Sequence, residues 1–105
     1  MNSCILSGIV TQVYFDTVGE GKQPFLSFLL RVRGPRAEGP AIARVVAYGE
    51  NAVQFYPLLR DGKQVEVEAR FRARRNRQPP AVAYEFVARR IEFPTIHEGD
   101  TDHAN

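Results

Sequence analysis

The amino-acid sequence predicts an all-β domain in which five strands close into a Greek-key barrel, with one short helix between the third and fourth strands. Three observations predict this class. Apolar and charged residues alternate strictly from 65 to 74, which is the side-chain period of a half-buried strand. Four further segments are rich in branched or aromatic residues and are bounded by Gly, Pro or polar residues. Only residues 50–59 carry apolar side chains at helical spacing.

The first three strands are expected before residue 50. Residues 3–15 are rich in Ile, Val and aromatic residues, and Gly8 within them marks a bend or a bulge. Residues 25–33 form a nearly continuous apolar run that ends in alternating arginines. Residues 41–49 form the third strand after a Gly- and Pro-rich loop. Alternation places four of its side chains on one face: Ile42, Arg44, Val46 and Tyr48.

The second half of the chain supplies the helix and the last two strands. The helix at 50–59 is expected to kink or end near Pro57, because proline lacks the backbone donor that a helix requires. Residues 63–77 form the fourth strand and residues 82–93 the fifth, with an irregularity near 88–90. Three strands, one helix and two strands, in this order, fit an OB-fold barrel.

The charge of the chain is distributed unevenly. Residues 1–93, the predicted OB domain, contain all fourteen Lys and Arg and nine of the acids, a net charge of +5. Residues 94–105 contain three acids and no Lys or Arg, and are predicted to be a short, acidic, disordered tail. The positive charge of residues 1–93 suggests a polyanionic partner. The acidic tail could compete with that partner for the same basic surface.

Composition also indicates the cellular compartment of the protein. Cys4 is the single cysteine, so no intrachain disulfide can form and a reducing compartment is expected. The apolar run near the N-terminus is too short for a signal peptide, and no stretch could span a membrane. A cytoplasmic protein without a membrane partner is therefore predicted.

The sequence offers little sign of catalysis. Both histidines lie in the tail, so no Ser/His/Asp set is suggested. Cys4 is interpreted as a small core residue, and the neighbouring Glu66 and Glu68 as solvated carboxylates. A metal site in the tail is conceivable, but a flexible polar tail is favoured there; its ligands would be His97, Glu98, Asp100, Asp102 and His103. No enzyme activity, metal or cofactor is expected.

The fourth strand carries the clearest functional pattern. Its alternation predicts a dry face toward the core, with Val65, Val67, Ala69, Phe71 and Ala73. The wet face runs from Glu66 and Glu68 into Arg70, Arg72 and Arg74, spaced by about 6.6 Å. This spacing is comparable to that of phosphates along an extended single strand, although a solvated strand face would look the same. Tyr48 and Tyr84 offer flat faces on which bases could stack.

Order and motifs together resemble the bacterial single-stranded DNA-binding protein family. The resemblance rests on three segments: NSCILSGIV at the start, ARVVAYGENAVQFYPLLRDGKQVEVEARFRAR in the middle and YEFVARRIEF near the end. It covers about residues 2–93, with a shortened loop at 34–40. It implies an OB fold, assembled as a homotetramer, that binds single-stranded DNA without sequence preference and serves replication, recombination or repair.

The resemblance also indicates a DNA-binding set. Tyr48 falls on a DNA-stacking aromatic, and Arg44, Arg72 and Arg74 fall on basic positions. Ile42 occupies the position of a stacking tryptophan and would give a base an apolar contact. The complete predicted set is Arg31, Arg33, Ile42, Arg44, Tyr48, Arg70, Arg72, Arg74, Arg75 and Arg77.

Departures from the family pattern keep two alternatives open. Three tryptophan platforms are missing, their positions being taken by Arg36, Ile42 and Asn76, and the long linker with its acidic recruiting tip is absent. The LSGxV opening and the IEF-to-EGD ending are similar to the primosomal replication accessory protein, a dimer that contacts replication-restart proteins. The missing tryptophans also fit an OB-type protein-interaction subunit that has no nucleic-acid role.

Overall fold

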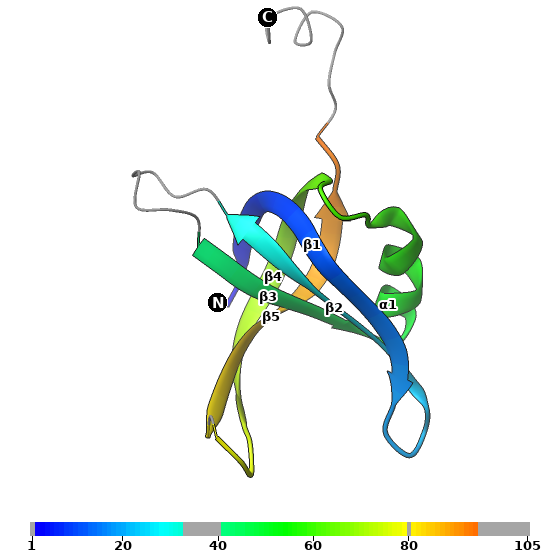
Figure 1. Cartoon of the computed structure of the whole chain (residues 1–105), viewed down its shortest axis with the longest axis vertical. Helices are drawn as coiled ribbons and strands as arrows, with labels where there is room; N and C mark the ends of the chain where they lie inside the picture. Colours follow the sequence, from blue (N-terminus) through cyan, green and yellow to red (C-terminus); the bar gives the residue numbers. More distant parts are fainter. Residues whose placement is uncertain (1, 33–40, 80, 95–105) are drawn as a thin grey trace, which may run out of the picture.

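Five strands close into a barrel in the order β1-β2-β3-β5-β4, with β4 pairing back to β1 (Figure 1). The computed structural model describes residues 2–32, 41–79 and 81–94. All neighbouring strands are antiparallel except β3 and β5, which run parallel. In chain order the elements are β1 (Cys4–Val18), β2 (Gln23–Val32), β3 (Ala41–Tyr48), α1 (Glu50–Phe55), the 3-10 helix η1 (Tyr56–Leu58), β4 (Gln64–Arg75) and β5 (Val82–Glu92). This closed topology confirms the predicted OB-fold barrel.

The barrel interior is filled by side chains from all five strands. In β2, Leu26, Phe28 and Leu30 point inward. On the opposite face Phe25 is buried and Leu29 is half-buried, which explains why the apolar run is nearly continuous. The three inward side chains meet fully buried branched residues from three other strands: Val10, Val45, Val65 and Val67. Burying these side chains supplies the main stabilisation of the domain.

The helical segment is short for a local reason. The chain enters α1 through Gly49, whose φ of 63° lies in the region that favours glycine. The α-helix ends at Phe55, and Pro57 lies in the following 3-10 turn, as predicted from its missing donor. Ala52 and Leu59 are buried against the barrel and anchor the segment to it. None of the described helices is long or apolar enough to cross a membrane.

β1 bends around the barrel and pairs with two strands in turn. Its register shifts between Thr11 and Tyr14, where Gln12 has a φ of 53°. Gly8 pairs regularly with both β2 and β4, so a bulge at Gly8 is not observed. A Cβ atom at Gly8 would collide with the carbonyl oxygen of Arg31. Glycine is therefore required at position 8 because two strands approach closely there.

Two hairpins, β1–β2 and β4–β5, extend beyond the barrel on the same side (Figure 1). In β5, Arg89 is an extra residue between the partners of Glu68 and Ala69, which confirms the irregularity predicted near 88–90. β3 pairs with β5 only at Phe86 and Val87. From Val82 to Glu85, β5 therefore pairs with β4 alone within the described residues, and the two strands form a projecting ribbon.

The burial along β4 differs from the prediction that Phe71 and Ala73 face the core. Val65, Val67 and Ala69 are buried as expected, but Phe71 is 40% exposed and Ala73 is exposed. The reason is that β1 pairs with β4 only as far as Ala69, where the barrel wall ends. Apolar residues still alternate along β4 beyond Ala69, but the hydrophobic core does not extend that far.

Candidate nucleic-acid interface

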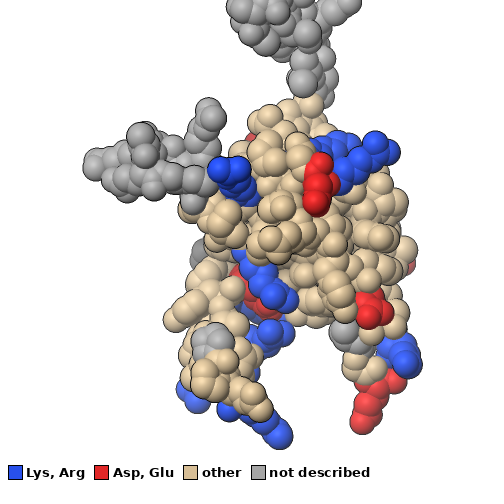
Figure 2. All heavy atoms as spheres, in the orientation of Figure 1, with Lys and Arg blue, Asp and Glu red and all other residues tan. Residues whose placement is uncertain are grey.

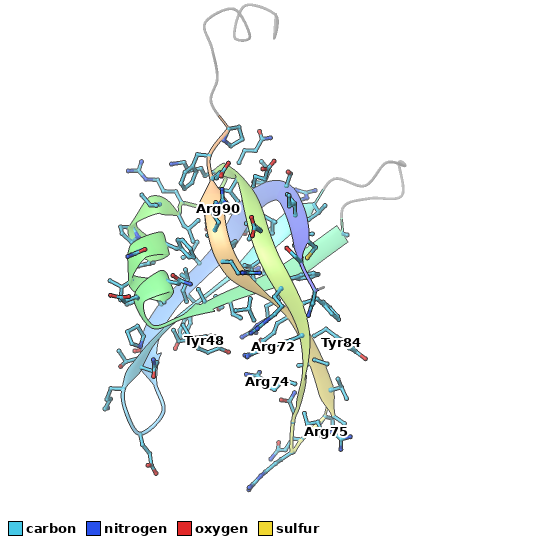
Figure 3. All side chains as sticks on the ribbon, turned by 180° about the vertical axis from the view of Figure 1, so that it is seen from behind. Tyr48, Arg72, Arg74, Arg75, Tyr84 and Arg90 are labelled. Atoms are coloured by element: carbon cyan, nitrogen blue, oxygen red, sulfur yellow. The ribbon has the colours of Figure 1, made fainter. Side chains whose placement is uncertain are left out.

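The two projecting hairpins leave an open space between them, and arginine side chains gather on the β4–β5 hairpin (Figure 2). Tyr48, Arg72 and Arg74 point into this space, whereas Tyr84 points away from it (Figure 3). We call the inter-hairpin surface the face formed by Phe25, Arg44, Tyr48, Arg70, Arg72, Arg74 and Glu85.

Strand register assembles this surface from distant parts of the sequence. Phe25 on β2 is paired with Tyr48 on β3, and directly paired residues share one face of a sheet. Arg72 on β4 is paired in the same way with Glu85 on β5. The parallel contact between β3 and β5 then brings Arg44 beside Glu85.

Glu85 lies at the centre of the inter-hairpin surface and is only 1% exposed. Its Oε1 atom accepts a hydrogen bond of 2.8 Å from Arg72 Nε and lies 2.6 Å from Arg72 Nη2. Its Oε2 atom lies 3.9 Å from Arg44 Nε and accepts no hydrogen bond within the described residues. A buried carboxylate needs such cationic neighbours to remain charged, so the glutamate and the two arginines form one unit.

Arg72 connects this unit to Tyr48. Its Nη2 atom donates a hydrogen bond of 2.7 Å to the Tyr48 hydroxyl, and its guanidinium carbon lies 5.2 Å from the centre of the tyrosine ring. The hydrogen bond with Glu85 is the main cause that raises the pKa of Arg72 above its ordinary value, against the opposing effect of burial. The charge of Arg72 is largely compensated by Glu85, and its position holds the Tyr48 ring.

An aromatic row continues from Tyr48 across the barrel. The rings of Phe25 and Tyr48 lie 5.2 Å apart, and those of Tyr14 and Phe25 lie 6.4 Å apart in an edge-on arrangement. Sequence reasoning missed Phe25 and Glu85 as members of the inter-hairpin surface, and Tyr14 as the neighbour of Phe25. Phe25 could have been found, because the alternation that places Arg31 on the outer face of β2 also places Phe25 there. Tyr14 lies beyond the register shift in β1, which no sequence pattern indicated.

The predicted arginines of β4 divide between the two faces of the ribbon. Arg70 and Arg74 flank Arg72 on the same face, because all three alternate along β4. Arg75 lies on the opposite face and Arg77 in the following turn. Within residues 2–32, 41–79 and 81–94, the four arginines other than Arg72 form no ion pair with an acid. They therefore carry the uncompensated charge of the hairpin.

The remaining predicted site residues lie away from this centre or outside the described chain. Arg31 is paired with Ile42, and both side chains are exposed on the outer face of β2 and β3. Arg33 lies outside the described residues, as do the five tail residues that are conceivable metal ligands. Among the residues that the structure describes, no three His, Cys, Asp or Glu side chains are grouped closely enough to hold a metal ion.

Cys4 and the β4 glutamates occupy the environments expected of them, with one difference. Cys4 is half-buried against the core, and its sulfur lies 3.5 Å from the Ala69 carbonyl oxygen. Glu66 is exposed, whereas Glu68 is half-buried and lies 3.7 Å from the Arg90 guanidinium.

Comparison with solved structures finds proteins with a similar fold. The fold is similar to the SSB domain of a Synechococcus sp. protein, with a TM-score of 0.71 and 24% identity over 88% of this chain and 94% of that one. It is also similar to Rim1, a mitochondrial single-stranded DNA-binding protein of S. cerevisiae, with a TM-score of 0.67 and 17% identity over 87% of this chain and 92% of that one. No family model and no curated protein matches the sequence. The similarity establishes a shared fold.

Proposed function

We propose that this protein binds single-stranded DNA without sequence preference, along the inter-hairpin surface. The observation that carries the proposal is the position of Tyr48. Its ring is held by Arg72 at the base of an open space, and the arginines on the β4–β5 side of this space, other than Arg72, form no ion pair within the described residues. Flat rings stack on any base and arginines attract any phosphate, so this combination binds a strand irrespective of its sequence. The two structural relatives, named as SSB or single-stranded DNA-binding proteins, support the proposal.

The predicted residues take different roles in this proposal. Tyr48 stacks on a base, and Ile42, which is 56% exposed, gives another base an apolar contact. Arg72 positions Tyr48, and Arg72 and Arg44 together balance Glu85. The phosphate backbone follows the arginines that form no ion pair in the described chain, together with Arg33, the residue that follows β2 in the sequence. The complete set is Arg31, Arg33, Arg70, Arg74, Arg75 and Arg77.

The proposal is tested by fluorescence anisotropy with labelled oligo-dT and with a duplex of the same length, over a series of salt concentrations. Preferential binding of the single strand, weakening steeply as salt rises, is expected. Absence of binding at low salt, or equal affinity for duplex, would refute it. Arg60→Ala serves as the matched control, because Arg60 is an exposed arginine before β4, at the opposite end of that strand from the tip of the β4–β5 hairpin.

The cellular role and the assembly belong to the same proposal. The protein protects single strands during replication, recombination or repair in the cytoplasm, as a binding protein without enzymatic activity. Self-association, as a homotetramer or a homodimer, is supported by β1: residues 4–7 pair only with β4 within the described chain, and Ile5 is 64% exposed beside them. An exposed strand edge with an apolar side chain favours pairing with a second chain.

Two measurements distinguish the alternative functions. The mass in solution separates a dimer, as in the primosomal replication accessory protein, from a tetramer. An OB-type protein-interaction subunit predicts that the double substitution of Arg70 and Arg74 by Ala leaves DNA affinity unchanged. These positions are better suited to the test than Arg72, because both side chains are exposed and make no ion pair within the described residues.

A further inference from the structure

The back of the β4–β5 hairpin, opposite the inter-hairpin surface, carries an exposed aromatic cluster. The rings of Phe71 and Tyr84 stack with their centres 5.7 Å apart and their planes at 10°. Phe86 lies 5.2 Å from Phe71 at an angle of 58°. Tyr84 is 63% exposed, and in Figure 3 it points away from Tyr48 and Arg72. An exposed stacked pair of this kind presents a flat apolar surface to whatever approaches the hairpin.

The position of this cluster is fixed by the surrounding structure. Phe86 packs against the hydrophobic core, which anchors one side of the cluster to the barrel. At the N-terminal end of the chain, the Asn2 side chain donates a hydrogen bond to the Phe71 carbonyl oxygen and accepts one of 3.1 Å from the Phe71 amide. The aromatic surface is thereby held in place before any ligand binds, which lowers the entropic cost of binding.

The charged residues around the aromatic cluster indicate which class of ligand it could bind. Within residues 69–79 and 81–88 the hairpin contains five arginines and one acid, Glu85, whose carboxylate is buried on the other face. Arg75 lies on the aromatic face itself, paired with Val82. A cationic or basic partner is disfavoured by this excess of positive charge. A partner that combines negative charge with flat rings, which is the chemistry of an unpaired nucleic-acid strand, is favoured.

We infer that Phe71 and Tyr84 form a second base-stacking surface, which a single strand reaches by passing from the inter-hairpin surface around the tip of the β4–β5 hairpin. This inference rests on the proposed function and extends it to the other face of the hairpin. Arg77 in the hairpin turn and Arg75 on the aromatic face lie along this path and would hold the phosphates between the two stacking sites.

The experiment compares two oligo-dT probes at the extremes of OB-fold site sizes, about four and about sixteen nucleotides long. The short probe occupies the inter-hairpin surface alone, and the long one can reach the back of the hairpin. Tyr84→Ala is expected to weaken binding of the long probe by about 5- to 150-fold, the loss of one stacked base, and to leave the short probe unaffected. Tyr84→Phe keeps the ring and is expected to bind both probes as the unmodified protein does. A long probe carrying a photoreactive uracil is expected to cross-link to Tyr84.

Each other outcome has a defined meaning. If Tyr48→Ala weakens binding and Tyr84→Ala leaves the long probe unaffected, the second site is wrong and the proposed function stands. Equal weakening of both probes by Tyr84→Ala also refutes the second site, since it indicates a general effect on the hairpin. A smaller mass of Tyr84→Ala in solution with unchanged DNA affinity assigns this face to a second copy of the chain instead. If neither probe binds the unmodified protein, both the proposed function and the second site fail.

Discussion

Glu85 and Arg72 face each other across β5 and β4, and the carboxylate of Glu85 accepts the hydrogen bond that Arg72 donates from Nε at 2.8 Å. The carboxylate is buried, whereas the arginine side chain is 35% exposed and continues to the Tyr48 hydroxyl. A central acid on a basic surface thus holds one arginine in place, while the neighbouring Arg70 and Arg74 form no ion pair within the described residues.

Replacing Glu85 tests this arrangement. Glu85→Gln keeps the shape of the side chain but removes the charge that compensates Arg72. We expect the free energy of unfolding, measured in urea, to fall by about 1–2 kcal/mol. This loss is smaller than for a fully buried ion pair, because water still reaches Arg72. Glu66→Gln on the exposed face of β4 is the control, with an expected change within about 0.5 kcal/mol. Equal stabilities of the two variants would contradict a structural role for the Glu85 charge.

The salt dependence of binding should distinguish Arg74 from Arg72. Arg74→Ala removes a charge that has no acidic partner in the described chain, so the slope of log affinity against log salt should fall by about 0.7. Arg72→Ala should lower the affinity with little change of slope, because the charge of Arg72 is already balanced by Glu85. Anisotropy titrations over a salt series measure both slopes, with Arg60→Ala as the control. A larger slope change for Arg72 than for Arg74 would be incompatible with this assignment.

Two substitutions of Tyr48 separate its ring from its hydroxyl. Tyr48→Ala removes the stacking surface and should weaken binding of oligo-dT by about 1–3 kcal/mol. Tyr48→Phe keeps the ring and loses only the hydrogen bond from Arg72, which should weaken binding by no more than about 1 kcal/mol. Titration of both variants with the same probe provides the comparison. An equal loss in both would mean that the hydroxyl, rather than the ring, carries the contact.

Tyr14 should show an altered titration. Its hydroxyl donates a hydrogen bond of 3.1 Å to Asp16, and this bond and the charge of Asp16 raise the pKa of Tyr14 above its ordinary value. Because the folded pKa is the higher one, the small stabilisation from this contact is present below the unfolded pKa and is lost as pH rises through the folded pKa. Ultraviolet titration should show one tyrosine moving to lower pKa in Asp16→Asn, and the same transition missing in Tyr14→Phe. An unchanged titration in Asp16→Asn would rule out the contact in solution.

Much of the fold was predictable because local patterns dictate it. Alternation correctly predicted that Arg44 and Tyr48 lie on the same face of β3. Pro57 predicted the end of the α-helix to within two residues. The face of Phe71 was also predicted correctly, but its burial was not. Alternation tells which side of a strand a residue occupies, and cannot tell where the neighbouring strand β1 stops.

The candidate site was predictable only in its separate parts. The arginine row of β4 and Tyr48 could each be recognised within one strand. The compensation of Arg72 by Glu85 could not, because it depends on the register of β4 against β5 and on the burial of one carboxylate among several. The register shift near Arg89 lies between these strands, and no local pattern specifies how the pairing continues beyond it.

The sequence by itself determined the order of the strands along the chain, the short helix and the excess of arginine on β4. Side-chain period, proline chemistry and charge are local properties of the chain. Only the tertiary structure decided which arginines are balanced by an acid, which aromatic residues line up with Tyr48, and that Phe71 and Tyr84 stack on the back of the hairpin. Those relationships join residues on different strands, and strand pairing and barrel closure bring them together.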